Sequence, residues 1–219
     1  MALAPAYTHP KPRLRGWLHL GALPIALLAG LALTATAPTL PGRLTAAVYT
    51  AASAALFGVS ALYHRTDLPD KTTAVLKRLD HANIYLIIAG TYTPIAALAL
   101  HGTPRTALLT VIWTGAALGV LFRILWHDAP RWLYTALYIV LGWSAVAVTP
   151  QLLAGAGLTA TILIYTGGVL YTIGALVYAL KKPNPSLQWF GFHEVFHAFT
   201  LAAYTAQFTA VALVVQAAT

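Results

Sequence analysis

The sequence contains no cysteine and very few charged residues. Without cysteine the chain forms no disulfide and offers no thiolate ligand, so a bound metal must be held by histidine, carboxylate or water. Only 8% of the 219 residues are charged, whereas 59% are hydrophobic, and the mean hydropathy is +0.73. This composition is far from that of a soluble domain and indicates a membrane protein.

The hydrophobic residues form runs that are long enough to cross a membrane as helices. A helix needs about 20 apolar residues to cross a hydrocarbon core roughly 30 Å thick, and its backbone polar groups pair internally there. The runs are too long for the alternating strands of a membrane barrel. We therefore expect an all-α, seven-transmembrane helix bundle in one domain, residues 17–219, after an N-terminal tail, residues 1–16. The expected helices are 17–37, 44–64, 80–100, 105–126, 130–150, 157–180 and 191–216.

The lysine and arginine residues predict the orientation of the bundle. Eleven of the thirteen fall on the side of the N-terminal tail, and only Arg43 and Arg105 fall on the other side. Because cytoplasmic loops carry the excess of Lys and Arg, we expect a cytoplasmic N-terminus and an extracytoplasmic C-terminus. The predicted location is the inner (plasma) membrane. No basic cluster interleaves with aromatic residues in a soluble segment, so the net charge of +8 does not indicate nucleic-acid binding.

The first apolar run has some features of a signal peptide. It follows Lys11, Arg13 and Arg15 and ends in the small residues at 35–37. The run is long for the apolar part of a signal peptide, however, and Pro38 is unfavourable directly after a cleavage point. We expect it to be retained as the first helix.

The polar residues within the apolar runs gather near the predicted cytoplasmic helix ends. His193 and His197 are four residues apart, so they share one helix face and can bind one ion. His64, at the end of the second helix, can supply a third nitrogen. Three protein ligands and a water are the usual set at catalytic zinc sites. Since ionisable groups inside a membrane are costly and mark function, we predict a zinc site there.

Two further residues complete the predicted site. Asp80, which is expected to open the third helix, would hydrogen-bond the zinc-bound water as a base, or orient an imidazole. The alternative is that Asp80 only caps its helix. Ser60 lies one turn deeper than His64, about 6 Å at 1.5 Å per residue, and would bind the same water or a substrate oxygen. His81 is a weak candidate for a fourth ligand.

The remaining histidines lie in tails, loops or interfaces and have no matched partner in the sequence, so they are interpreted as non-ligands. These are His9, His19, His101 and His127.

The run from His193 to His197 also matches the H-E-x-x-H pattern of zinc proteases, in which Glu194 would be the general base. An intramembrane metalloprotease is therefore an alternative. The protease pattern does not require a third histidine, whereas this chain offers His64 on the same side.

Three segments resemble the hemolysin III branch of the progestin and adipoQ receptor (PAQR) superfamily. They are Ser60-Ala-Leu-Tyr-His64, the run LDHANIYLIIAGTYTP from Leu79 to Pro94, and GFHEVFHAF from Gly191 to Phe199. The resemblance implies seven helices, a cytoplasmic N-terminus and a zinc near the cytoplasmic leaflet. It also implies that the ligands are His64, His193 and His197, with Asp80 at the zinc-bound water and Ser60 nearby.

The functional hypothesis is a membrane zinc protein in lipid homeostasis that hydrolyses a lipid amide or ester. The resemblance extends to a wider superfamily that includes the alkaline ceramidases, which hydrolyse lipid amides. The partners of this chain would be membrane lipids, with a lipid or fatty acid bound within the bundle. The main alternative is a non-enzymatic receptor or membrane-state sensor, in which zinc ties the second and seventh helices together. A pore-forming hemolysin ranks last, because the helices show no pore-lining amphipathic pattern.

Overall fold

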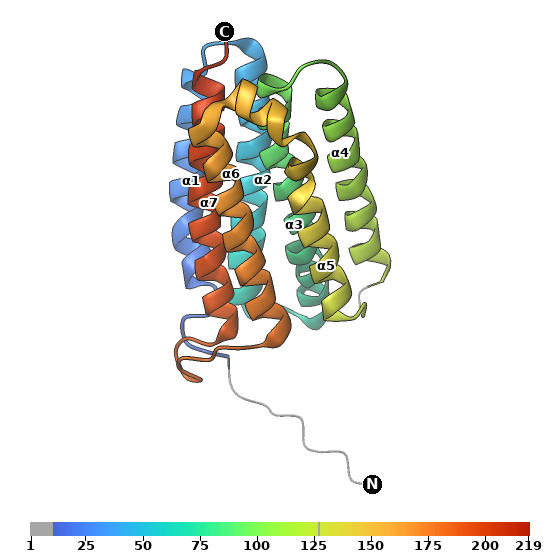
Figure 1. Cartoon of the computed structure of the whole chain (residues 1–219). Helices are drawn as coiled ribbons and strands as arrows, with labels where there is room; N and C mark the ends of the chain where they lie inside the picture. Colours follow the sequence, from blue (N-terminus) through green and yellow to red (C-terminus); the bar gives the residue numbers. More distant parts are fainter. Residues whose placement is uncertain (1–10, 127) are drawn as a thin grey trace.

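The computed structural model describes residues 11–126 and 128–219, and every long element in these ranges is a helix (Figure 1). Residues 1–10, which contain His9 and most of the predicted tail, and His127 lie outside the described residues. The elements are α1 (Trp17–Thr36), α2 (Leu40–Arg65), α3 (Asp70–Ala99), α4 (Gly102–Leu125), α5 (Arg131–Gly142), the 3₁₀ helix η1 (Trp143–Val148), α6 (Thr149–Leu180) and α7 (Phe192–Gln216).

Seven helical stretches within the described residues are long and apolar enough to cross a membrane, which confirms the predicted all-α, multi-pass fold. The fifth stretch, Arg131–Gly155, combines α5, η1 and the first residues of α6. The chain then bends at Gly157, whose φ of 80° lies in the left-handed region that favours glycine. The sixth stretch, Gly157–Leu180, starts directly after this bend.

The seven stretches form one bundle in which α3 is the most enclosed helix. In its most apolar window, 67% of the residues are buried, compared with 22% for α1. It packs against both α2 and α4, and α7 packs against α6, α1 and α3. The outward surface is apolar, with side chains such as Ile25, Leu28 and Val140 about 70% exposed. A lipid-facing exterior accounts for this surface.

The two ends of the bundle carry different segments of the chain. The starts of α1, α3 and α7 lie at the same end as the finish of α2, whereas the C-terminus lies at the opposite end (Figure 1). An odd number of spans requires this separation. Which end faces the cytoplasm remains a prediction from the basic residues.

One predicted boundary is wrong, and it concerns a candidate site residue. The third helix begins at Asp70, so Asp80 neither opens nor caps it, but lies about 15 Å farther along. Residues 70–79 carry four charged side chains before Asp80, so no apolar run marks this part of the helix. No proline or glycine interrupts the segment after Pro69, so the helix extends beyond its apolar part.

Candidate metal centre

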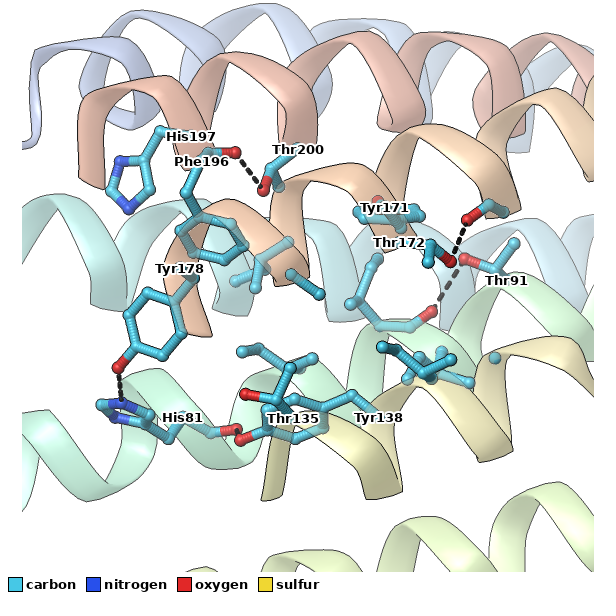
Figure 2. Close-up of a pocket in the computed structure, with 18 of the residues that line it drawn as sticks. His81, Thr91, Thr135, Tyr138, Tyr171, Thr172, Tyr178, Phe196, His197 and Thr200 are labelled. Atoms are coloured by element: carbon cyan, nitrogen blue, oxygen red, sulfur yellow. Dashed lines mark hydrogen bonds between the residues drawn. The ribbon is translucent and has the colours of Figure 1, made fainter. Parts of the chain in front are cut away.

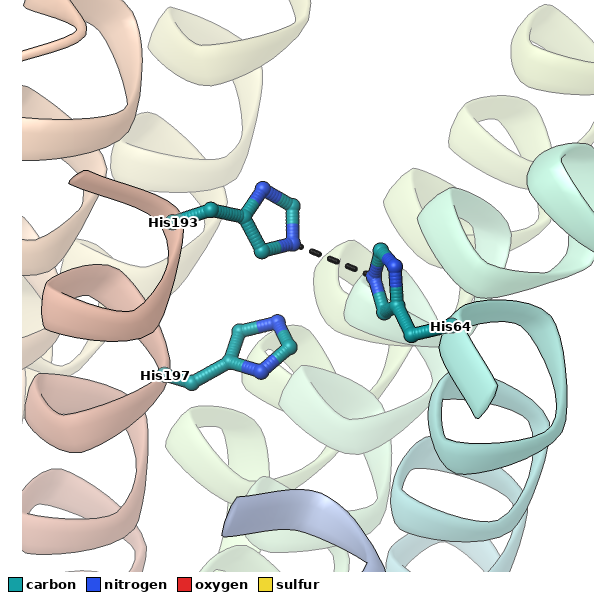
Figure 3. Close-up of side chains that lie close together, drawn as sticks. All are labelled: His64, His193 and His197. Atoms are coloured by element: carbon teal, nitrogen blue, oxygen red, sulfur yellow. Dashed lines mark hydrogen bonds between the residues drawn. The ribbon is translucent and has the colours of Figure 1, made fainter. Parts of the chain in front are cut away.

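Three imidazoles from the two ends of the chain meet at one end of the bundle. His64 lies in the last turn of α2, and His193 and His197 lie in the first two turns of α7 (Figure 3). One ring nitrogen of each residue lies within 4.8 Å of the other two. The Nε2 atoms of His64 and His193 are 3.1 Å apart. The sequence predicted this convergence, and the fold brings the three residues together.

The spacing of these nitrogens suits a single metal ion. Two nitrogens at 2.0–2.1 Å from one tetrahedral zinc stand roughly 3.3–3.4 Å apart, close to the separation of the His64 and His193 Nε2 atoms. His64 is 9% exposed and His197 is 2% exposed, so these two imidazoles are largely removed from water, whereas His193 is half-buried. Their neutral nitrogens are the donors that zinc accepts when thiolates are absent. The donor set therefore fits zinc.

Asp80 lies beside the three histidines although it comes from a different helix. Its Oδ2 atom is 3.9 Å from His64 Nε2, and its side chain is 14% exposed. This distance exceeds a hydrogen bond, so the carboxylate does not simply orient that imidazole. It is suitably placed to contact a small molecule held between the imidazoles.

Ser60 is placed one turn below His64, as predicted, but its contact is unexpected. Its hydroxyl lies 2.8 Å from Nδ1 of His19, which comes from α1. The ring of His19 stacks on the ring of His197, with centroids 3.7 Å apart and an interplanar angle of 7°. The sequence reading of His19 as a residue without a matched partner is therefore wrong. The signal was available, because His19 lies in the first turn of a helix that starts at the same end.

Glu194, the residue between the two α7 histidines, is engaged on both carboxylate oxygens. Oε2 accepts a hydrogen bond from the Gly191 backbone N–H at 2.8 Å, and Oε1 forms an ion pair with Arg15. The side chain is 1% exposed. Glu194 thus caps α7 and anchors the segment before α1, which is not the placement of a general base.

His81, the weak candidate for a fourth ligand, lies outside the histidine cluster but lines the cavity that begins beside it. Nδ1 lies 2.6 Å from the Lys77 carbonyl oxygen, and Nε2 lies 3.1 Å from the Tyr178 hydroxyl (Figure 2). Both ring nitrogens therefore have partners other than the histidine cluster. His101 directly precedes α4 and is also outside the cluster.

A cavity begins at the histidine cluster and continues into the bundle (Figure 2). Its volume is about 130 Å³, while one water needs only about 10–15 Å³. Ser60, Asp80 and His197 line one end, and Gln207 lies ten residues farther along α7, or roughly 15 Å. Between them the wall is mainly aliphatic and aromatic. The cavity therefore joins a polar end, beside the histidine cluster, to an apolar interior.

The fold and the site together define a class, the multi-pass integral membrane proteins with a buried histidine cluster at one end of a seven-helix bundle. Residues 7–208 match the family model described as "Haemolysin-III related". The chain belongs to this family, which confirms the resemblance noted in the sequence.

Individual relatives support the same assignment. The chain is 37% identical over 141 residues to a "Hemolysin-3 homolog" of Bacillus subtilis (strain 168), covering 63% of this chain and 62% of that protein. It is 34% identical over 164 residues to "Hemolysin-3" of Bacillus cereus, covering 74% and 70%. It is 24% identical over 173 residues to the human "Monocyte to macrophage differentiation factor", covering 77% and 69%. The match to the human protein supports membership of the wider PAQR superfamily.

Proposed function

We propose that the protein is a zinc-dependent membrane hydrolase that cleaves a lipid amide or ester in membrane lipid homeostasis. The observation that carries the proposal is the position of the Asp80 carboxylate, which lines the same cavity end as His193 and His197 and is 3.9 Å from His64. A structural metal site would require no additional carboxylate beside its ligands and no cavity leading away from it.

The residues divide the chemistry between them. His64, His193 and His197 would hold the zinc ion. The ion would act as a Lewis acid and lower the pKa of a water molecule to about 7. Asp80 accepts the proton of the attacking water and returns it to the leaving nitrogen or oxygen as the acyl bond breaks. Ser60 lies where its hydroxyl can bind the carbonyl oxygen of the substrate as negative charge develops there.

The cavity supports an acyl lipid as the class of substrate. Its apolar wall, formed by residues such as Leu56, Ile84 and Ile88, excludes water and suits a hydrocarbon chain. The polar end would place the amide or ester carbonyl beside Asp80. A long-chain acyl lipid meets both requirements, and its hydrolysis yields a fatty acid and an amine or alcohol.

The test compares Asp80→Asn with the wild-type protein in detergent micelles. We expect the variant to retain zinc but to lose at least about 100-fold in fatty-acid release from a panel of ceramide-like lipids and phospholipids. Asp70→Asn is the matched control, because Asp70 is an exposed carboxylate in the first turn of the same helix. A zinc-loaded wild-type protein that releases no fatty acid from any of these lipids would overturn the proposal.

A second function is favoured by one specific observation, namely that among the described residues the candidate ligands come from α2 and α7 alone. Zinc would then join the two helices in a receptor or membrane-state sensor. In that case Asp80→Asn leaves the membrane phenotype unchanged, whereas His64→Ala lowers thermal stability and abolishes the phenotype. The lipid assay and the stability measurement separate the two functions.

A further inference from the structure

The first helix contributes a side chain to the metal centre. We propose that His19 is a positioning residue, which holds the ring of His197 for metal binding and the hydroxyl of Ser60 for the substrate. The inference deepens the proposed function and rests on it for the role of the metal. It depends on contacts that join three helices, α1, α2 and α7.

The first contact is the stack on His197. The two rings are nearly parallel, at 7°, and their centroids are 3.7 Å apart. A ligand imidazole must present one nitrogen to the ion in a fixed plane, and rotation about its side-chain bonds would move that nitrogen away. A neighbouring ring that covers its face restricts this rotation before the ion binds. Such outer contacts commonly change metal affinity by about 10–100-fold.

The second contact is the hydrogen bond to Ser60. The distance between Ser60 Oγ and His19 Nδ1 is 2.8 Å, and Ser60 is 1% exposed while His19 is 3% exposed. A serine hydroxyl in a helix usually turns back to a carbonyl of the preceding turn, as Ser53 does with the Tyr49 carbonyl. The Ser60 hydroxyl instead has the His19 ring and the Asp80 carboxylate as its partners, at the end of the cavity that both of these residues line.

His19 occupies this position at an energetic cost. Its Nε2 atom is buried and has no hydrogen-bond partner among the described residues. A buried polar atom without a partner costs about 1–3 kcal/mol, a cost that a phenylalanine at this position would avoid. The edge of Phe57 packs against the ring at a centroid distance of 5.2 Å, so the pocket already suits an aromatic ring. Packing alone therefore does not explain a histidine, whereas the bond to Ser60 does.

The experiment separates the two contacts with two substitutions. His19→Phe keeps a ring on His197 but loses the bond to Ser60, and His19→Ala removes both. We expect zinc affinity, measured by chelator competition in micelles, to fall about 10–100-fold in His19→Ala and to stay within about threefold of wild type in His19→Phe. Fatty-acid release at saturating zinc should fall in His19→Phe to the level of Ser60→Ala. His101→Ala, which lies outside the cluster, is the control and should change neither quantity.

Thermal unfolding, measured with and without zinc, distinguishes a positioning role of His19 from a purely structural role. A structural role lowers the melting temperature of His19→Ala but leaves the increment added by zinc unchanged, and this result would overturn the proposal. Equal zinc affinity of His19→Ala and wild type, or an equally weak His19→Phe, would also overturn it. If the wild type binds zinc but releases no fatty acid, the proposed hydrolytic function is overturned. The zinc-affinity measurements still decide the role of His19 in that case. A wild type without zinc affinity would overturn both proposals.

Discussion

Arg15 forms an ion pair with Glu194, so the segment before α1 is anchored to the first turn of α7. The same segment pairs with the loop before α7, because the Arg13 and Leu14 backbone N–H groups donate to the carbonyls of Gln188 and Trp189. Glu194 lies directly after His193, and its second oxygen caps the helix. The ion pair therefore fixes the turn that carries a candidate metal ligand.

The first prediction concerns the charge of Glu194. Glu194→Gln keeps an oxygen that can accept from the Gly191 N–H but removes the charge that faces Arg15. We expect the free energy of unfolding to fall by roughly 1.5–3 kcal/mol, with zinc content and lipid hydrolysis retained in the folded protein. Thermal unfolding and metal analysis of the purified variant provide the measurement.

The partner residue supplies the control. Arg15→Met should destabilise the protein by a similar amount, and adding it to Glu194→Gln should cost less than it does alone, because the two residues act as a pair. If Glu194→Gln instead abolished hydrolysis without affecting stability, Glu194 would be the general base of the H-E-x-x-H alternative.

The second prediction is that all three histidines are needed for zinc. His64→Ala leaves two imidazoles on α7, and His193→Ala leaves one on each helix, so neither variant retains the three-ligand set. We expect zinc content to fall from about one ion per chain to nearly none in either variant. Atomic emission analysis after gel filtration measures it. Full retention of zinc in His64→Ala would exclude α2 from the site.

The sequence predicted the histidine cluster because the helical spacing of the histidines and the distribution of basic residues together indicate how deep each histidine lies in the membrane. The spacing of His193 and His197 places them on one helix face, and the distribution of basic residues places the end of the second helix at the same level. These arguments need no knowledge of how helices pack. For the same reason they could not show that His64 approaches His193 to 3.1 Å.

The features that the sequence did not predict depend on packing and on helix ends. The charged residues at 70–79 concealed the first ten residues of α3. The fifth predicted helix, 130–150, contains a 3₁₀ segment, Trp143–Val148, and continues to Gly155 before the bend. The contacts of His19 do not follow from the sequence, because its partners Ser60 and His197 lie on distant segments, although its depth matches theirs.

The third prediction concerns the close approach of the Gly16 backbone to His64, a candidate metal ligand. Gly16 precedes α1 with a φ of 80°, and a Cβ atom there would lie 2.7 Å from the Cβ atom of His64. Gly16→Ala would therefore force alanine into a left-handed conformation, which costs about 1–2 kcal/mol. Its Cβ atom would also clash with His64, a candidate metal ligand. We expect a lower melting temperature and weaker zinc binding in chelator competition.

Gly21→Ala is the matched control for this substitution. Gly21 lies within α1, where no atom would lie within 4 Å of an added Cβ. Alanine should raise stability there by about 0.5–1 kcal/mol, because it favours the helix. Equal behaviour of the two variants would show that the contact between Gly16 and His64 does not constrain the site.

The fourth prediction is the orientation of the bundle in the membrane. Alkaline phosphatase folds to an active form only after export, so a fusion after Thr219 should be active, because the C-terminus is expected outside. A fusion after Lys182, in the loop between α6 and α7, should be inactive at equal expression.

The opposite pattern would contradict the prediction from the basic residues. It would also move the histidine cluster to the outer leaflet, since His64 and His193 lie at the same end of the bundle as that loop. The fusions therefore decide which leaflet supplies the lipid for the proposed hydrolysis.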